Sequence, residues 1–261
     1  MRCAVVGHVE WVEFARVPAM PAAGEIVHAD RVWQEPGGGG AVVARQLALL
    51  AGGCDFFTAL GDDELGRTSE RMLAKLGIAV HARFFGATRR AWVHVDARGE
   101  RTITVLGDKL LPDRLPPLDA YDAVVFVSGT PEALRQARAA AFLAATLREL
   151  PTLQAGGVPL DLLVGSVSDP GEQPDEALES RLLVLTDGAA GGTANGEPFP
   201  AVPLPGPVAD SYGAGDSFAA ALCFALARGD ALADALGLAA KAGAAAMTGA
   251  GPYAGQLASD A

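Results

Sequence analysis

A carboxylate and two glycines stand immediately before a long apolar helix in the segment DSYGAGD, residues 210–216. The residues that follow, 219–228, are strong helix formers, and Gly229 is a typical C-terminal cap. The first backbone N–H groups of such a helix have no intrahelical partner, and the helix dipole is positive there. Phosphate oxygens can therefore bind at this turn without a cationic side chain.

The small residues of the turn, Gly213, Ala214 and Gly215, let a phosphate approach the backbone closely. Asp216 follows in the first turn of the helix. It can accept the proton of an attacking hydroxyl while the N–H groups stabilise charge on a transferred phosphoryl group. The same segment also fits an ordinary helix start, because an aspartate near the N-terminus favours any helix. The chemistry that it suggests is phosphoryl transfer.

The segment closely resembles the D-T-x-G-A-G-D signature of the ribokinase-like (PfkB) family of carbohydrate and nucleoside kinases, with Ser211 in place of the usual Thr. Three further stretches resemble other motifs of that family, in the family's order. They are VVG at 5–7 followed by PGGGG at 36–40, FFTALGDDELG at 56–66, and VLTDGAAG at 184–191. The resemblance implies a three-layer α/β/α fold with a mostly parallel central sheet and a small β-sheet lid.

The resemblance also implies roles for single residues. Asp216 would be the catalytic base, and the backbone of Gly213 to Gly215 would form the anion hole. ATP and Mg²⁺ would be the cofactors. The residues expected to contact the substrate are Glu10, Gly37, Gly38, Gly39 and Asp216. The glycine run has a plainer explanation too, since glycines form turns at many strand–helix junctions.

The residues that would face the nucleotide by the same resemblance are Thr186, Gly188, Gly191, Ser211 and Gly243. Gly243 lies in an Ala-rich predicted helix over residues 230–247, whose small side chains permit either tight helix packing or room for an adenine ring. The family's N-x-x-E motif, which organises magnesium through water, has SVSD at 166–169 as its nearest match. Asp169 can act in an outer metal shell, but D-P-G is also a typical loop turn.

The stretch after the first strand departs from the family's G-x-x-N-x-D pattern. It reads GHVEWVE, with Glu10 at the Asn position and Val12 at the Asp position. A carboxylate accepts hydrogen bonds from sugar hydroxyls, so we expect Glu10 to contact the substrate, with Glu13 as a weaker candidate. Either can also be only a polar strand residue. The family's Asn after the glycine pair is replaced by Val42, which removes one polar contact.

The 261 residues are 50% hydrophobic and carry a formal net charge of −11. Such a chain can bury a large core, and we expect a single domain over residues 1–261. The acidic balance argues against nucleic acid or an anionic membrane as a partner. Cys3, Cys54 and Cys223 have no metal-type spacing and fit buried free thiols. No signal-type or membrane-spanning pattern is found, so we predict a cytoplasmic protein.

Short apolar runs alternate with helical patterns along the chain, which favours a mostly parallel sheet covered by helices. We predict strands over 3–6, 54–59, 123–127 and 182–185, and helices over 41–51, 63–76 and 131–147. The region between 147 and 161 lacks the family's usual strand with a charged end. The lid strands would come from about 10–35 and 88–107. Lid strands often pair subunits in this family, so a homodimer is a further expectation.

Other nucleotide-binding classes fit less well. Lys75, Lys109 and Lys241 are the only lysines and none follows a glycine, which excludes a P-loop. The glycine run lacks the third glycine of a dinucleotide-binding fingerprint. The histidines have no metal-ligand spacing, so we expect structural or surface positions for them.

The sequence predicts an ATP-dependent kinase that phosphorylates a hydroxymethyl group of a small sugar. A nucleoside kinase stays open as an alternative, in which the apolar Trp11, Val12 and Val42 would enclose a base. A non-catalytic sugar or nucleotide sensor also stays open, although a pure binding protein has no need for the base.

Overall fold

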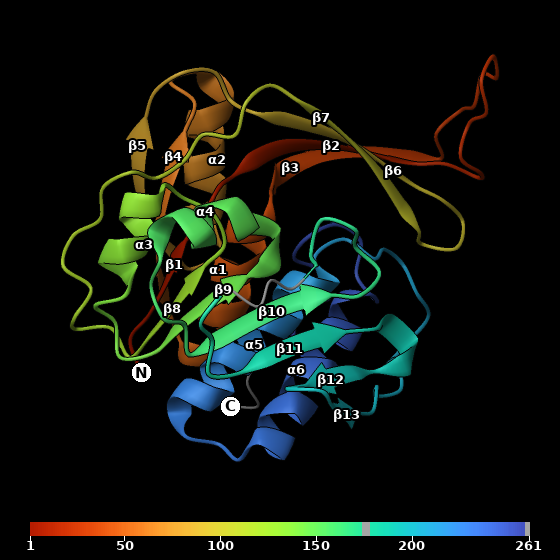
Figure 1. Cartoon of the computed structure of the whole chain (residues 1–261). Helices are drawn as coiled ribbons and strands as arrows, with labels where there is room; N and C mark the ends of the chain where they lie inside the picture. The colour runs from red at the N-terminus through yellow and green to blue at the C-terminus, as the bar shows by residue number, and fades with distance from the viewer. Residues whose placement is uncertain (174–177, 259–261) are drawn as a thin grey trace.

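The computed structural model describes residues 1–173 and 178–258. In this part of the chain, nine strands form one central sheet in the order β13-β12-β11-β10-β9-β8-β1-β4-β5 (Figure 1). The strands are β1 (Cys3–Val6), β4 (Cys54–Leu60), β5 (Ile78–Phe84), β8 (Ala123–Phe126), β9 (Leu143–Thr146), β10 (Leu162–Ser166), β11 (Leu183–Thr186), β12 (Gly192–Ala194) and β13 (Glu197–Phe199). All pairs from β11 to β5 are parallel, and β12 and β13 are antiparallel. The predicted mostly parallel sheet is confirmed.

Helices cover both faces of the central sheet, which gives the predicted three layers (Figure 1). One face carries α1 (Gly39–Ala51), α2 (Glu64–Lys75), α5 (Ala214–Arg228) and α6 (Leu232–Ala246), and the other carries α3 (Pro131–Ala137) and α4 (Leu150–Gly156). Short 3-10 turns η1 (Leu147–Glu149) and η2 (Gly188–Ala190) follow β9 and β11. Within the described ranges, no helix combines the length and apolar character that crossing a membrane requires.

The apolar strands are buried on both faces because successive side chains point in opposite directions. Cys3 and Val5 of β1 pack into the core under α1 and α5, whereas Ala4 and Val6 pack into the core under α3. This double burial explains why the central strands are continuous apolar runs rather than alternating ones.

Local signals begin and end several helices as predicted. Asp63 accepts a hydrogen bond from Gly66 N at 2.9 Å before α2, and Thr130 accepts one from Ala133 N at 3.2 Å before α3. Gly229 closes α5 with a φ of 94°, in the left-handed region that favours glycine.

The predicted helix over 131–147 is wrong beyond Ala137. The later part of that segment contains β9, which pairs in parallel with both β8 and β10 in the middle of the sheet. Alanine-rich segments have high helix propensity, but a buried place between two strands outweighs it. Oδ2 of Asp161 accepts hydrogen bonds from Nη1 of Arg138 after α3 and from Leu143 N at the start of β9, both at 2.8 Å. The sequence pattern thus placed a helix over β9, and it also did not predict the parallel strands β5 and β10.

A second sheet, which we call the lid sheet, has the order β3-β2-β6-β7. Its strands are β2 (Glu10–Arg16), β3 (Arg31–Gly37), β6 (Arg90–Val95) and β7 (Arg101–Leu106). The outer pairs are antiparallel, and β2 pairs with β6 in parallel. Figure 1 shows this sheet extending sideways from the central sheet. It is the small sheet that the predicted fold required.

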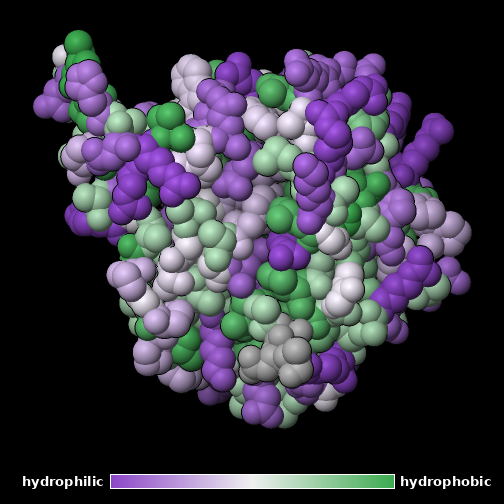
Figure 2. Space-filling model, turned by 180° about the vertical axis from the view of Figure 1, so that it is seen from behind, coloured by the Kyte–Doolittle hydropathy of each residue, from purple (hydrophilic) through white to green (hydrophobic). Residues whose placement is uncertain are grey.

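The lid sheet is fixed by a small core of its own. Val12, Phe14 and Val93 on one face pack against Val42 of α1 and against Tyr212. Beyond β2, the segment 18–30 leaves this core and projects from the body of the molecule (Figures 1 and 2). One face of the lid sheet is therefore packed against the rest of the protein, whereas the segment 18–30, which connects β2 to β3, is exposed.

Leu134 tests the packing of α3 on the central sheet. It is fully buried in the core beneath that helix, so Leu134→Ala should leave a cavity and lower the free energy of unfolding by about 2–5 kcal/mol. Urea denaturation measures this. Leu232→Ala is the control, because Leu232 is 42% exposed and its loss should change stability by less than about 0.5 kcal/mol. Equal effects of the two changes would contradict the layer assignment.

Candidate active site

The N-terminus of α5 is open at the turn predicted to bind phosphate. Gly213 precedes the helix with a φ of 79°, and a β-carbon there would lie 2.9 Å from Cγ1 of Val42. Glycine is thus needed at 213 for both conformation and space. Gly215 is exposed, and a β-carbon on it would meet no described atom within 4 Å. An anion can therefore reach the N–H groups of this first turn.

The glycine run brings the start of α1 against Asp216. A β-carbon on Gly39 would lie 2.9 Å from Oδ1 of Asp216, and one on Gly38 would lie 3.1 Å from Cγ of Glu10. Gly38 has a φ of 86° at the entry to α1. The structure thus gathers the residues that sequence analysis assigned to the base and to the substrate.

Asp216 is partly buried in the first turn of α5. Burial raises the pKa of its carboxyl group, and the charge of Glu10 acts in the same direction. The positive charges of Arg101, His8 and Arg148 oppose this shift, but the pKa stays above the ordinary value. A carboxylate with a raised pKa is a stronger base, which suits removal of a proton from a hydroxyl.

Glu10 has the opposite electrostatic environment. Burial alone would raise the pKa of its carboxyl group, but contact with His8 and the charges of His8, Arg89 and Lys109 bring the pKa below the ordinary value. Oε1 lies 3.4 Å from Nε2 of His8, and Oε2 lies 3.4 Å from Nε of Arg89. Lys109 itself is 2.5 Å from Oε1 of Glu149. Glu10 is therefore ionised at neutral pH.

His8 and Glu13 differ in their position relative to Glu10. His8 is buried beside Glu10, and its Nδ1 lies 2.8 Å from the hydroxyl of Ser128. Glu13 lies on the other face of β2 from Glu10, where it pairs with Arg90. The spacing of three residues along a strand already implies opposite faces, so this signal was present in the sequence.

Two segments of the chain, residues 1–148 and 163–258, match the pfkB family of carbohydrate kinases. The chain belongs to this family. A fructokinase from Klebsiella pneumoniae is 37% identical over 98 residues, and the match spans 34% of this chain but only 32% of that relative's length.

Solved structures share the fold of this pfkB-family chain. A ribokinase from Cryptococcus neoformans var. grubii serotype A in complex with ADP has a TM-score of 0.73 at 24% identity, covering 96% of this chain and 94% of that one. Arabidopsis thaliana ribokinase complexed with ribose and ATP also has a TM-score of 0.73, at 20% identity, covering 96% and 93% of the two chains. The α/β/α core with its small lid sheet is therefore that of ribokinases.

Two residues of the signature segment hold the turn of this pfkB-family protein in place. Asp210 is buried and accepts hydrogen bonds from Tyr212 N at 2.9 Å and Gly251 N at 3.0 Å. The hydroxyl of Tyr212 accepts one from Gly38 N at 2.9 Å, and a β-carbon on Gly37 would lie 2.8 Å from that hydroxyl. Neither role was predicted from the sequence. The aromatic residue at the variable position of the signature was the available signal.

The far end of the lid sheet contacts the same segment. Ser211 N donates to Gly99 O at 3.0 Å, and Nη1 of Arg101 donates to the carbonyl and hydroxyl oxygens of Ser211 at 2.9 and 3.1 Å. Nη1 of Arg16 donates to Ala209 O at 3.0 Å. Ser211, which was expected to face the nucleotide, thus links the lid to the turn that begins α5.

The other predicted nucleotide residues lie at the ends of β11 and α6. Thr186 ends β11, and the turn that follows is closed by Gly191 N donating to Gly188 O at 3.2 Å. A β-carbon on Gly243 would lie 3.2 Å from Ala214 O, so this glycine permits close packing of α6 on the start of α5. Contact of these residues with a nucleotide stays a prediction.

Asp169 lies in an acidic and basic cluster after β10. It forms an ion pair with Arg148, and sequence analysis missed its neighbour Glu172. Oε1 of Glu172 lies 3.1 Å from Nε of Arg148, and Oε2 accepts from Ser166 N at 2.9 Å. Burial raises the pKa of Glu172, and the charge of Asp216 contributes to this. The cluster is therefore within electrostatic reach of Asp216.

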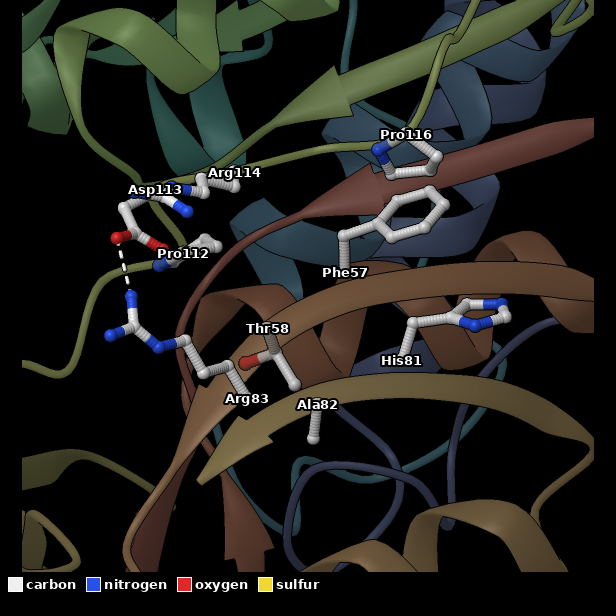
Figure 3. A pocket seen from close by; sticks show the side chains of 9 residues that line it. All are labelled: Phe57, Thr58, His81, Ala82, Arg83, Pro112, Asp113, Arg114 and Pro116. Carbon is white, nitrogen blue, oxygen red and sulfur yellow. Dashed lines mark hydrogen bonds and ion pairs between the residues drawn. The ribbon is translucent and has the colours of Figure 1, made fainter. Parts of the chain in front are cut away.

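A separate groove lies over the outer strands of the central sheet (Figure 3). Arg83 and Asp113 of its lining form an ion pair, with their nearest atoms 2.5 Å apart. The lining residues are Phe57, Thr58, His81, Ala82, Arg83, Pro112, Asp113, Arg114 and Pro116. None of the side chains around Asp216 belongs to this lining, so the groove is not the site described above.

Gly39 tests the contact between the glycine run and Asp216. An added methyl group would have to displace the carboxylate, so Gly39→Ala should lower kcat/KM of the kinase reaction about 100-fold or more. Gly237→Ala on α6 is the control, because its β-carbon would meet no described atom within 4 Å. Circular dichroism checks that both variants fold. If the two variants keep the same activity, the contact is irrelevant to the reaction.

Proposed function

We propose that the chain transfers the γ-phosphoryl group of ATP to a hydroxymethyl group of a small sugar. The observation that carries this proposal is the position of Asp216, in the first turn of α5, against Gly39 and beside the open N–H groups of the turn. Membership of a carbohydrate kinase family supports phosphoryl transfer. The similarity to a fructokinase and to a ribokinase complexed with ribose and ATP supports a sugar as acceptor and ATP as donor.

In the proposed reaction, Asp216 accepts the proton of the acceptor's hydroxyl group as the oxygen attacks the γ-phosphorus in line. The O–P bond to the acceptor forms, the bond from the γ-phosphorus to ADP breaks, and ADP leaves. The N–H groups of Gly213, Ala214 and Gly215 hold the charge that develops on the transferred group. The backbone of Gly37, Gly38 and Gly39, with Glu10, orients the acceptor. The nucleotide lies toward Thr186, Gly188, Gly191, Ser211 and Gly243.

Magnesium fits this site as an ion bound through water and phosphate. Among the described residues, no group of three or more His, Cys, Asp or Glu side chains is arranged to hold a metal. Mg²⁺ commonly keeps several waters and takes its other ligands from phosphates and one or two carboxylates. Asp169 and Glu172 would hold the ion indirectly, by accepting hydrogen bonds from its bound waters. When bound, the ion neutralises charge on the transferred phosphate.

Burial of the apolar candidates favours a sugar over a nucleoside. Val12 and Val42 have no exposed surface and belong to the core under the lid sheet, and Trp11 is 7% exposed. The two valines are committed to packing and Trp11 is nearly buried, so none of the three offers an exposed face for a base. A non-catalytic sensor is supported less, because a pure binding protein gains nothing from a carboxylate with a raised pKa at the anion-binding turn.

Turnover of Mg²⁺-ATP with a panel of pentoses, hexoses and nucleosides tests the function. We expect ADP release with a sugar, and Asp216→Asn should lower kcat by about 10²- to 10⁴-fold because the general base is lost. Asp234→Asn is the matched control, an exposed aspartate in the first turn of α6, and should keep full activity. A nucleoside as the best acceptor would favour the alternative, and full activity of Asp216→Asn would remove the base assignment.

The raised pKa of Asp216 predicts the acid side of the pH profile. The deprotonated carboxylate is the active form, so kcat/KM should fall as the pH drops through a pKa above the 3.8 of an ordinary aspartate. Arg101→Gln removes a positive charge that lowers this pKa, and should move the midpoint to higher pH. Arg98→Gln, on the same hairpin and 83% exposed, is the control and should leave the midpoint in place. A midpoint unmoved by Arg101→Gln counts against titration of Asp216.

A further inference from the structure

Arg89 and Glu10 form an incomplete ion pair. Nε of Arg89 lies 3.4 Å from Oε2 of Glu10, and the two side chains are only 17% and 11% exposed. Both atoms are buried, and neither has a hydrogen-bond partner among the residues that the structure describes. Buried polar atoms in proteins are nearly always hydrogen-bonded. This pair therefore has one donor and one acceptor left over for a further polar group.

The neighbouring pair on the opposite face of the same strands is complete. Arg90 donates from both Nε and Nη2 to Oε1 of Glu13. The backbone holds both pairs in register, since β2 and β6 run in parallel and Trp11 N donates to Arg89 O at 2.9 Å. The strands can thus form a closed Arg–Glu pair. Of these two pairs, only Arg89 and Glu10 lack a hydrogen bond to each other.

The open pair lies next to the reacting groups. A β-carbon on Gly38 would lie 3.1 Å from Cγ of Glu10, and one on the next residue, Gly39, would lie 2.9 Å from Oδ1 of Asp216. Glu10 and Asp216 therefore contact consecutive residues of the glycine run. An acceptor whose hydroxyl faces Asp216 can place a second oxygen at the Arg89–Glu10 pair.

A hydroxyl group matches both unpaired atoms. It can donate its hydrogen to Oε2 of Glu10 and accept from the Nε–H of Arg89 at the same time. An anionic group can accept a hydrogen bond from Arg89, but the ionised carboxylate of Glu10 would repel it. The surrounding charges also balance, with Arg89 and Lys109 set against Glu10 and Glu149. The chemistry of this subsite suits a neutral acceptor.

We propose that Arg89 and Glu10 together bind one hydroxyl group of the acceptor and thereby select an uncharged, polyhydroxylated substrate. This inference rests on the kinase function proposed above and adds Arg89 as a specificity-determining residue. Glu10 is the first residue of β2, and Arg89 immediately precedes β6. The bound hydroxyl group therefore also joins two lid strands at the point where they leave the central sheet.

Steady-state kinetics on the best acceptor of the panel tests the proposal. Arg89→Ala should raise the KM for the acceptor about 10-fold or more and leave the KM for ATP unchanged, because the site loses a substrate hydrogen bond. Arg90→Ala and Glu13→Gln are the matched controls and should change the acceptor KM less than about twofold. Arg89→Lys keeps the charge but not the Nε–H, and should recover only part of the loss.

Monodeoxy analogues of the acceptor identify the hydroxyl group that is bound. One analogue should be poor for the wild type yet equal to the parent sugar for Arg89→Ala. Thermal melting of each variant shows whether it folds, and Arg89→Lys serves if Arg89→Ala does not. If the wild type is active but Arg89→Ala and Arg90→Ala alter the acceptor KM equally, the pair is only structural. A wild type inactive on every acceptor overturns the proposed function itself.

Discussion

The close approach of the glycine run to the backbone at Gly7 and His8 determines the geometry of the whole site. A β-carbon on Gly7 would lie 2.7 Å from Cα of Gly40, and one on Gly40 would lie 2.7 Å from His8 O. Helix α1 can begin directly over the end of β1 only because these side chains are missing. That position sets Gly39 against Asp216 and Gly38 against Glu10. A bulkier residue at any of these points would push Asp216 and Glu10 away from the glycine run.

Environment gives the two carboxylates of the site different properties. Desolvation dominates at Asp216 and raises its pKa, whereas His8, Arg89 and Lys109 outweigh desolvation at Glu10 and lower its pKa. One carboxylate is thus suited to accept a proton, and the other is suited to accept hydrogen bonds as a permanent anion. The same residue type serves both purposes because each side chain comes from a different element and meets different neighbours.

Packing and hydrogen bonds connect the lid sheet to the turn that precedes α5. Tyr212 packs under the lid and accepts a hydrogen bond from the glycine run, while Asp210 fixes the backbone of Tyr212. At the other end of the lid, Gly99 and Arg101 bind Ser211. Movement of the lid would therefore disturb the residues immediately before Gly213. In the proposed reaction, this would link the part of the protein that covers the acceptor to the part that holds the phosphate.

The sequence by itself determined the features that depend on neighbouring residues in the chain. These are the start of α5 with Asp216 in its first turn, the lid hairpin, and the alternation of strands and helices. It did not reveal β9, because an alanine-rich segment is ambiguous until neighbouring strands bury it. His8, Arg89 and Tyr212 were also hidden, since each acts through contacts with residues far away in the chain. Only the tertiary structure decided these features. The burial of a side chain and the charges around it depend on residues from several helices and strands. A single segment of the sequence does not reveal which of those residues become neighbours.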